Sequence, residues 1–353
     1  MTYYVKFEKM IQEAKILSPS TGFTPQTQAV ERRKDTLLDR WCRINIERAS
    51  RPKDRAGDSS VMQLVESSQR NCPFCPGRID ASTPMFPKEI VPEGRLKVGE
   101  AVAFPNLFAF AQHHAVVVLT REHFLPLDGF KPEIIKNGLD ASIMYLKAVR
   151  ASNPQVRFCS INWNFMPTAA ASMVHPHLQI IADETPTRYI NEAMEASQRF
   201  IRKNGVSYWD DLVEAERECG DRFIADVGES RWLASFCGLG NNDVVGIFAK
   251  SSLFELSEEA LNDIAEGLSI MLRGYHSIGV QGFNLSLYSG PLNVKTQGFN
   301  VHLHMISRPD IRAMYTADTG FMERLHDEIV VETRPEDVAL RIRGVVNRPS
   351  GRL

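Results

Sequence analysis

The sequence predicts an α+β protein made of two tandem units, each with mainly antiparallel sheet and flanking helices. Two observations predict it. The order strand, helix, strand, strand occurs twice along the 353 residues, and each copy ends in the pattern His-x-His. In each copy, one segment has apolar residues at helical spacing, and its neighbours are the short apolar runs typical of strands.

The first copy is expected to place its strands and helix at 114–123, 135–146, 156–162 and 174–181. The second copy repeats this order at 243–252, 257–271, 283–288 and 301–307. Ser257 is a plausible N-cap for the second helix. The distance along the chain from His123 to His177 matches that from Ser252 to His304 within two residues. We therefore interpret the repeat as an internal duplication.

This organisation predicts an N-terminal unit at 1–190, a helical connector at 191–235 and a C-terminal unit at 236–353 with a degenerate site. The first 40 or so residues are polar, and their pattern predicts no particular element.

Composition excludes several classes of protein. A formal net charge of −2 gives no general attraction to nucleic acid or anionic membranes. No apolar run approaches the length of a membrane span, and the N-terminus lacks the apolar stretch of a signal peptide. The six cysteines are sparse, which is typical of a reduced compartment. We therefore expect a cytoplasmic protein that binds neither nucleic acid nor membranes.

The segment VHPHLQII (174–181) carries the main functional signal. Alternate side chains of a strand share a face, so His175, His177 and Gln179 should project together. Pro176 between the histidines favours an edge or irregular strand. A histidine pair of this kind can also be a satisfied polar patch. The neighbouring His113 and His114 are expected only to cap the start of a strand.

A second signal is NCPFCPG (71–77), which spaces Cys72 and Cys75 as C-x2-C. Two thiolates at this spacing can hold one face of a tetrahedral zinc ion, and two more ligands must come from elsewhere. His123 and His175 are the natural candidates. The same spacing also occurs in redox-active cysteine pairs.

Five motifs in one order carry a family resemblance: RASRP (48–52), NCPFCPG, FPNLFAF (104–110), TREH (120–123) and N-x7-S-x2-HPHLQ (164–179). In this order the sequence resembles the galactose-1-phosphate uridylyltransferase family, the transferase branch of the histidine-triad superfamily. The segments HLH (302–304) and RPEDVALRIR (334–343) resemble its C-terminal half. The resemblance covers about residues 40–345 and implies two histidine-triad-like units.

The resemblance implies a nucleotidyltransferase. Such an enzyme moves a nucleoside monophosphate group between a nucleoside-diphosphate sugar and a sugar 1-phosphate, through a covalent nucleotidyl-histidine. Here His177 would be the nucleophile, and Gln179 would donate a hydrogen bond to a phosphate oxygen. The ligands of a closed structural zinc site would be Cys72, Cys75, His123 and His175.

Further positions match nucleotide- and phosphate-binding residues of the family. Nucleotide sugars and other phosphate-bearing small molecules are therefore the expected partners, and two copies of the chain could pair as a homodimer. The matching residues are Arg48, Arg51, Asn106, Phe108, Asn164 and Ser172.

Several positions depart from the family pattern. Leu178 replaces a glycine beside the nucleophile. When His302 and His304 are aligned with His175 and His177, Ile306 falls at the position of Gln179, so the second site is expected to be incomplete. The sugar-recognising Gly-Tyr-Glu becomes Gly-Phe-Met-Glu at 320–323, which changes the expected acceptor. Two alternatives stay open: a nucleotide-sugar or dinucleoside-polyphosphate phosphorylase that uses inorganic phosphate, and a non-catalytic nucleotide-binding zinc protein.

Overall fold

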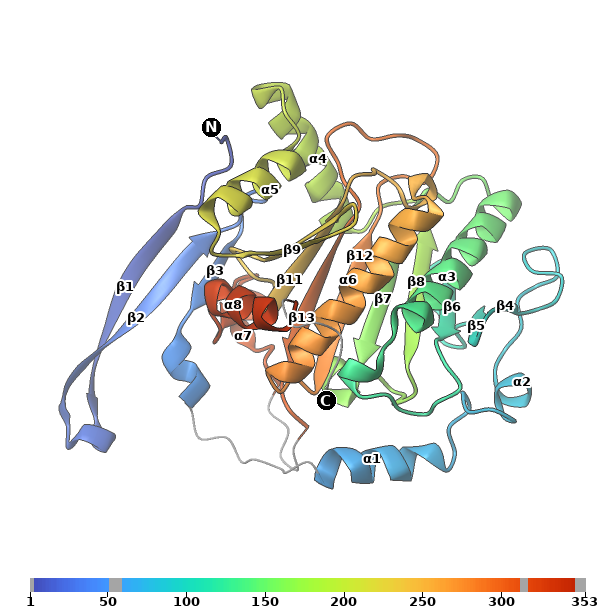
Figure 1. Ribbon diagram of the computed structural model, residues 1–353, viewed down its shortest axis with the longest axis horizontal. Helices are drawn as coiled ribbons and strands as arrows, with labels where there is room; N and C mark the ends of the chain where they lie inside the picture. Colours follow the sequence, from blue (N-terminus) through green and yellow to red (C-terminus); the bar gives the residue numbers. More distant parts are fainter. Residues whose placement is uncertain (1–2, 51–58, 312–316, 347–353) are drawn as a thin grey trace.

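The structure is a computed structural model that describes residues 3–50, 59–311 and 317–346. Its main feature is a ten-stranded sheet in which every pairing is antiparallel (Figure 1). In spatial order the strands are β4 (Leu96–Val98), β5 (Ala101–Pro105), β6 (His113–Val118), β8 (His177–Asp183), β7 (Phe158–Phe165), β12 (Gly282–Tyr288), β13 (His302–Arg308), β11 (Asn241–Phe248), β10 (Ser230–Ala234) and β9 (Phe223–Val227). The predicted α+β class with mainly antiparallel sheet is confirmed.

The strand order has internal symmetry. Reading inwards from each edge, both halves place their strands in the same sequence: first, second, third, fifth, fourth. The two halves join where β7 pairs with β12, with Trp163 opposite Leu285. This mirrored order is what a duplicated unit produces when the two copies pair through the same strand. The two copies thus share one sheet.

Two long helices cover one face of this sheet. They are α3 (Pro132–Ser152) in the first half and α6 (Glu258–Ser277) in the second, and they pack against each other. The apolar stripe predicted for α3 is buried, and the hydroxyl of Ser257 accepts from the backbone N–H of Ala260 at 3.2 Å, as expected of an N-cap. Gly267 allows α6 to approach the sheet, because a Cβ there would lie 2.3 Å from the ring of Trp232.

The connector between the halves contains both helix and strand. Its helices are α4 (Arg188–Asn204) and α5 (Tyr208–Cys219), and the strands β9 and β10 follow them. Trp209 of α5 joins an apolar cluster with Val245 and Ile247 of β11. The segment 191–235 was expected to be helical, but it also contains β9 and β10. These two strands form the outer edge of the second half of the sheet. The boundaries 1–190, 191–235 and 236–353 stay a prediction.

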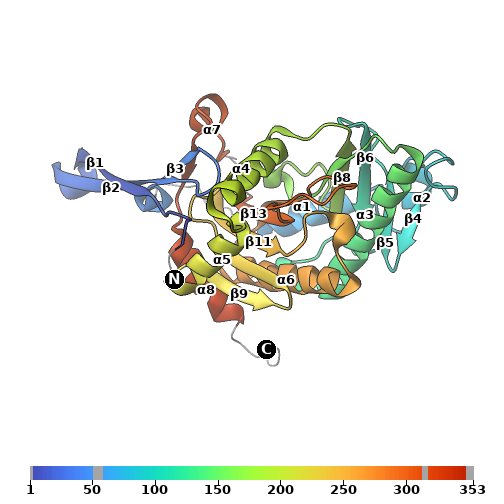
Figure 2. The same cartoon turned by 90° about the horizontal axis from the view of Figure 1, so that it is seen from above.

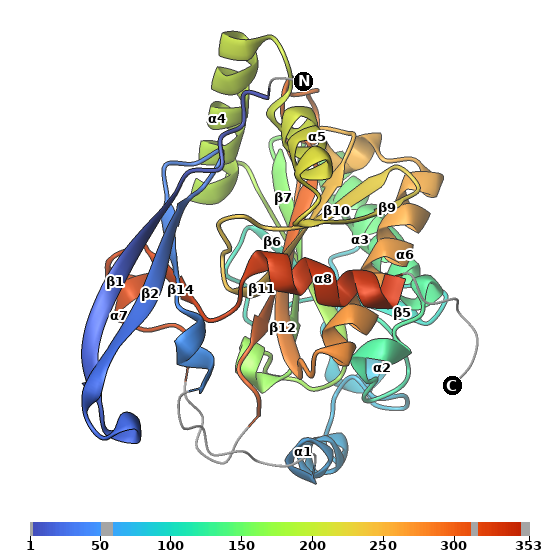
Figure 3. The same ribbon diagram turned by 60° about the vertical axis from the view of Figure 1, so that its left-hand side comes forward.

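The N-terminal residues form a second, four-stranded sheet. Its order is β1 (Lys9–Ser18), β2 (Thr24–Lys34), β3 (Trp41–Ile44) and β14 (Ile329–Val331), and the last pair is parallel. The β1–β2 hairpin extends away from the body of the protein (Figures 2 and 3). No element is predicted for this segment from the sequence, because it is polar and β1 is exposed along nearly all of its length.

The other described helices are short or lie at the rim. They are α1 (Ser59–Gln69), α2 (Ile79–Ser82), α7 (Phe321–Leu325) and α8 (Pro335–Val346), of which α8 packs on α6. Among the described residues, no helix has the combination of length and apolar character needed to cross a lipid bilayer.

A buried ion-pair network joins the small sheet to the body. The guanidinium of Arg33 on β2 is 2% exposed and lies 2.8 Å from both Glu31 and Glu336 of α8. Glu336 also pairs at 3.0 Å with Arg222, which in turn pairs with the buried Glu216 of α5. Buried charges of this kind depend on one another, because a charge left without its partner keeps its full desolvation cost.

Replacing Arg33 with methionine should lower the free energy of unfolding by about 3 kcal/mol, because it removes the cation that Glu31 and Glu336 share and leaves them only their pairs with Arg334 and Arg222. Urea denaturation measures this change. Lys34→Met is the matched control, since Lys34 forms an exposed pair with Asp39 and should change stability by about 1 kcal/mol or less. Equal effects of the two substitutions would contradict the role given to the network.

Candidate active site

The start of β8 presents side chains to both faces of the sheet. Leu178 points toward α3, where it lies 3.3 Å from the position that a Cβ on Gly138 would take. His177 and Gln179 therefore point to the opposite face. Leu178, which stands at the position of the family's glycine, is buried on the helix side of the sheet and so lies on the other face from His177.

The ring of His177 is held in one orientation. Its Nδ1–H donates to the carbonyl of His175 at 2.8 Å, which leaves the lone pair on Nε2. Within the described ranges no protein group bonds to that Nε2. Burial lowers the pKa of His177, so the imidazole is neutral near pH 7. The ring of Phe74, from the C-x2-C segment, packs edge-on against it at 5.4 Å. The arrangement offers a neutral, oriented nitrogen nucleophile.

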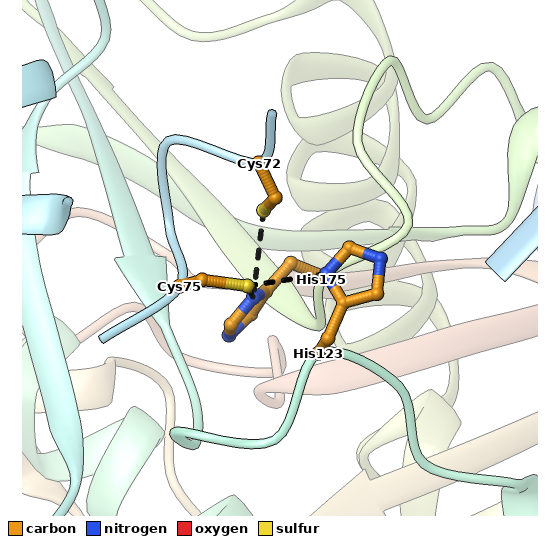
Figure 4. A group of neighbouring side chains, drawn as sticks. All are labelled: Cys72, Cys75, His123 and His175. Atoms are coloured by element: carbon orange, nitrogen blue, oxygen red, sulfur yellow. Dashed lines mark hydrogen bonds between the residues drawn. The ribbon is translucent and has the colours of Figure 1, made fainter. Parts of the chain in front are cut away.

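Four side chains converge beside this strand, as Figure 4 shows. The ligand atoms of Cys72, Cys75, His123 and His175 all lie within 4.8 Å of one another. Cys75 Sγ is 3.5 Å from His123 Nδ1 and 3.7 Å from His175 Nδ1. Ligands bound to one tetrahedral zinc at ordinary Zn–S and Zn–N lengths would be separated by about 3.5 Å. The cluster could therefore hold a metal ion.

The histidines of this cluster are aimed by their other ring nitrogens. His175 Nε2–H donates to the carbonyl of Thr120 at 2.8 Å, and His123 Nε2–H donates to the hydroxyl of Ser68 at 2.9 Å. Both Nδ1 lone pairs then face the thiols, as in metal sites whose ligands are oriented from outside. Burial raises the pKa of Cys75 to about 11 and lowers that of His175 to about 4. A bound cation would favour the thiolate form instead.

Gln179 has protein partners on its oxygen. His114 Nε2 lies 3.0 Å from Gln179 Oε1, and the amide nitrogen of Asn106 lies 3.5 Å from the same oxygen. Asn106 Oδ1 accepts from the backbone N–H of Phe108 at 2.9 Å. The β5–β6 loop thus brings Asn106 next to Gln179, and the ring of Phe108 on the same loop is exposed.

Asn164 is held by the second half of the chain. It lies two residues beyond Asn162, which is opposite Gln179, so it belongs to the same face of the sheet. Asn284 of β12 donates to Asn164 Oδ1 at 2.7 Å and to the carbonyl of Ala169 at 2.9 Å. Ser172 lies exposed in the β7–β8 loop.

The structure describes one of the two predicted arginines. Arg48 belongs to the short helical segment Ile46–Ser50 that follows β3 of the small sheet, not to the sheet that carries His177. Arg51 lies outside the described residues.

The structure corrects the alignment of the two copies. β8 begins at His177 and β13 begins at His302. The carbonyls just before these strands, Pro176 and Val301, accept equivalent bonds from Leu119 and Phe248 at 3.0 Å. His302 therefore takes the place of His177, and His304 takes that of Gln179. The predicted alignment, which pairs His302 with His175 and His304 with His177, is wrong by two residues. A shift of two residues keeps every side chain on its face, so the alternation could not reveal the error.

The equivalent histidine of the second half is closed off. His302 Nδ1 donates to the carbonyl of Asn300 at 2.9 Å, the same local bond as in His177. Its Nε2, however, accepts from the hydroxyl of Tyr189 at 3.0 Å, and the ring of Trp209 stacks on it at 4.2 Å. His302 is fully buried. Side chains of α4 and α5 therefore occupy the second ring nitrogen of His302 and cover its ring.

Comparisons with known proteins place this fold. No family model matches the chain. An uncharacterized protein from Archaeoglobus fulgidus is 30% identical over 342 residues, which is 97% of this chain and 99% of the relative. The chain belongs to the same family as this archaeal protein.

Solved structures of other proteins share this fold. ADP-glucose phosphorylase from Arabidopsis thaliana, with bound ADP-glucose, superposes with a TM-score of 0.70 at 19% identity, over 89% of this chain and 98% of that one. By sequence, the curated phosphorylase from that plant is 25% identical over 209 residues, 52% of this chain and 57% of the relative. A uridylyltransferase structure superposes with a TM-score of 0.66 at 20% identity, over 89% of this chain and 98% of that one. The predicted resemblance to the galactose-1-phosphate uridylyltransferase family is confirmed, and the fold is that of the family.

Some residues at this site were missed in the sequence. The sequence predicts only a strand-capping role for His114, yet its ring reaches Gln179. It indicates no role for Asn284, which bonds to Asn164 from the other half. Both contacts cross between strands whose register the sequence does not specify. The FNLSLY pattern marked the strand of Asn284, but no local signal marked its partner.

Cys72→Ser should abolish tight metal binding, because the serine hydroxyl replaces one of the two thiolates. Elemental analysis of purified protein measures the metal content, and a thermal melt should show lowered stability. The exposed Cys219 provides the control substitution Cys219→Ser, which should leave both unchanged. Full metal content in Cys72→Ser would rule out this ligand set.

Proposed function

We propose that the protein is a nucleotidyltransferase that forms a covalent nucleotidyl intermediate on Nε2 of His177. The donor would be a nucleoside-diphosphate sugar, and the acceptor a second phosphate compound. The single observation that supports this most strongly is the contrast between the two halves. Both hold a histidine by the same bond to the carbonyl two residues earlier, but only His302 has its Nε2 occupied by a protein hydroxyl.

The first half-reaction would be an in-line displacement. Nε2 of His177 attacks the α-phosphorus, a phosphorus–nitrogen bond forms, and the bond from the α-phosphorus to the bridging oxygen breaks. The sugar 1-phosphate leaves with the bonding electron pair. Gln179 would donate its amide N–H to the phosphate oxygen on which charge increases. Because the ring is already held by the His175 carbonyl, it loses little orientational freedom when the substrate binds.

The second half-reaction would reverse these roles. An oxygen of the acceptor phosphate attacks the same phosphorus, and the phosphorus–nitrogen bond breaks, which returns neutral His177. Asn164, Ser172, Asn106 and Phe108 would contact the nucleotide and its phosphates. Arg48 and Arg51 would add phosphate contacts from the segment after β3.

We infer that the metal ion is zinc. Two thiols and two imidazoles form a donor set that zinc prefers, and four protein ligands leave no position open for substrate. When bound, zinc would supply a fixed anchor for the residue next to the nucleophile. The chain's own contribution is the bond from His175 to Thr120 and the packing of Phe74 on His177, which hold the strand start in register.

Two acceptors are to be distinguished. The family fold supports a sugar 1-phosphate, which makes the reaction an exchange between nucleotide sugars. The likeness to ADP-glucose phosphorylase supports inorganic phosphate, which would release a nucleoside diphosphate. A further observation favours phosphate. Glu323 belongs to the Gly-Phe-Met-Glu segment that replaces the family's sugar-recognising Gly-Tyr-Glu. Its carboxylate accepts hydrogen bonds from the backbone N–H groups of Gly320 at 2.7 Å and Val330 at 3.2 Å, so it is engaged within the protein rather than by an acceptor sugar.

His177→Gly should form no nucleotidyl adduct with ADP-glucose or UDP-glucose, while it keeps its metal and its melting temperature. Intact-protein mass spectrometry detects the adduct in the parent protein as an added nucleoside monophosphate and also identifies the base. Free imidazole should restore partial turnover, because the vacated space can hold the missing ring.

The matched control for this test is His302→Ala, at the equivalent position of the second half. Its adduct should form at the parental rate, provided that a thermal melt shows an intact fold. An adduct that persists at normal rate in His177→Gly would exclude the mechanism. Absence of any adduct in the parent would instead support a non-catalytic nucleotide-binding protein.

The acceptor is identified by adding it to the isolated adduct. If inorganic phosphate is the acceptor, it should discharge the adduct and release a nucleoside diphosphate. Glucose 1-phosphate or galactose 1-phosphate should then react more slowly, at equal concentration. Chromatography of the released nucleotide measures both. Faster discharge by a sugar 1-phosphate would assign the enzyme as a transferase.

A further inference from the structure

We propose that His114 is a positioning residue that fixes the side-chain amide of Gln179 so that its N–H groups face the reacting phosphate. This inference rests on the proposed function and deepens it, since it concerns how the same site stabilises charge. His114 lies on β6, two residues before Val116, which is the cross-strand neighbour of Gln179. Its side chain is 4% exposed.

The hydrogen bonds around His114 define its tautomer. The backbone N–H of Phe110 points at His114 Nδ1 at 3.4 Å, so Nδ1 carries the lone pair. The proton of a neutral ring is then on Nε2, which lies 3.0 Å from Gln179 Oε1 and can donate to it. Burial lowers the pKa of His114 and favours this neutral form. The ring of Phe110 packs edge-on against it at 4.3 Å.

The bond from His114 selects one orientation of the Gln179 amide. An amide can flip by half a turn, which exchanges its oxygen and nitrogen. Two donors, His114 Nε2–H and the Asn106 amide, meet at Oε1, so a flip would set donor against donor. The Asn106 nitrogen also lies 3.2 Å from His114 Nε2, and both groups share the Gln179 oxygen. In the described part of the chain, the Gln179 Nε2 has no acceptor and is free to donate to substrate.

The second half contains an equivalent hydrogen bond in which the donor and the acceptor strands are exchanged. Asp243 of β11 lies two residues before Val245, which is the cross-strand neighbour of His304. Both its carboxylate oxygens lie 3.0 Å from His304 Nδ1. Asp243 and His304 thus occupy the positions of His114 and Gln179. In each half, the residue on the outer strand holds the side chain two positions after the central histidine, which indicates a paired position of the fold rather than a chance contact.

The test uses the metal-loaded, full-length protein and a nucleotide sugar that forms the adduct. His114→Phe keeps an aromatic ring but removes the donor, and His114→Gln supplies an N–H that can reach Gln179. We expect His114→Phe to slow adduct formation about tenfold at saturating substrate, the value of one directed hydrogen bond, with little change in KM. His114→Gln should recover most of this rate.

A double-mutant cycle separates positioning from a general structural effect. Gln179→Ala should slow the reaction about a hundredfold, as expected for a lost phosphate donor. His114→Phe should then cause no further loss in the Gln179→Ala background, because there is no amide left to orient. A further tenfold loss in that background, or no recovery in His114→Gln, would overturn the proposal. Metal content and melting temperature are measured for every variant.

A second measurement does not depend on catalysis. In protein labelled with ¹⁵N-histidine, His114 should show the Nε2-protonated neutral tautomer near neutral pH, identified by the signal that disappears in His114→Phe. Gln179→Ala should shift that signal. A signal from the Nδ1-protonated tautomer or from the imidazolium would overturn the proposal even in a protein that forms no adduct, whereas failure of the adduct alone would overturn only the proposed function.

Discussion

The site depends on one short hydrogen bond, from Nδ1 of His177 to the carbonyl of His175. This bond leaves the lone pair of the His177 ring on Nε2. It also links that ring to the backbone of His175, whose side chain belongs to the group that could hold a metal ion. The ring of His175 is oriented in turn by the hydrogen bond from its Nε2–H to the carbonyl of Thr120. Three residues at the start of one strand thus have separate tasks, because alternation directs His177 and Gln179 to one face and Leu178 into the helix layer.

The second half shows the same local backbone with a different set of neighbours around its histidine. His302 keeps the local bond, but Tyr189 fills its second nitrogen and Trp209 stacks on its ring. Both aromatic residues come from the connector helices α4 and α5. The difference between the halves therefore lies in the segment inserted between the copies. The second half also contributes to the site of the first half, because Asn284 of β12 donates a hydrogen bond to Asn164 of β7.

Polar contacts around the candidate nucleophile form a connected set rather than isolated pairs. His114, Asn106 and Gln179 share one oxygen, and the backbone of Phe110 fixes the donor that approaches it. These hydrogen bonds are partly buried, so a flipped amide would leave donors facing each other with reduced access to water. A glutamine amide, which can flip freely in solution, is thereby held in one orientation.

The sequence by itself determined the α+β class, the duplication, the positions of the long helices and the four residues that could hold a metal ion. Strand alternation, helical periodicity and C-x2-C spacing are local properties, and each was visible in the order of residues. Only the tertiary structure decided which histidine of the second copy matches His177, because a slip of two residues leaves strand alternation unchanged. It also decided that His114 reaches Gln179 and that Trp209 covers His302. Those contacts join residues on different strands or helices, and their partners are set by register and packing, which the local sequence does not specify.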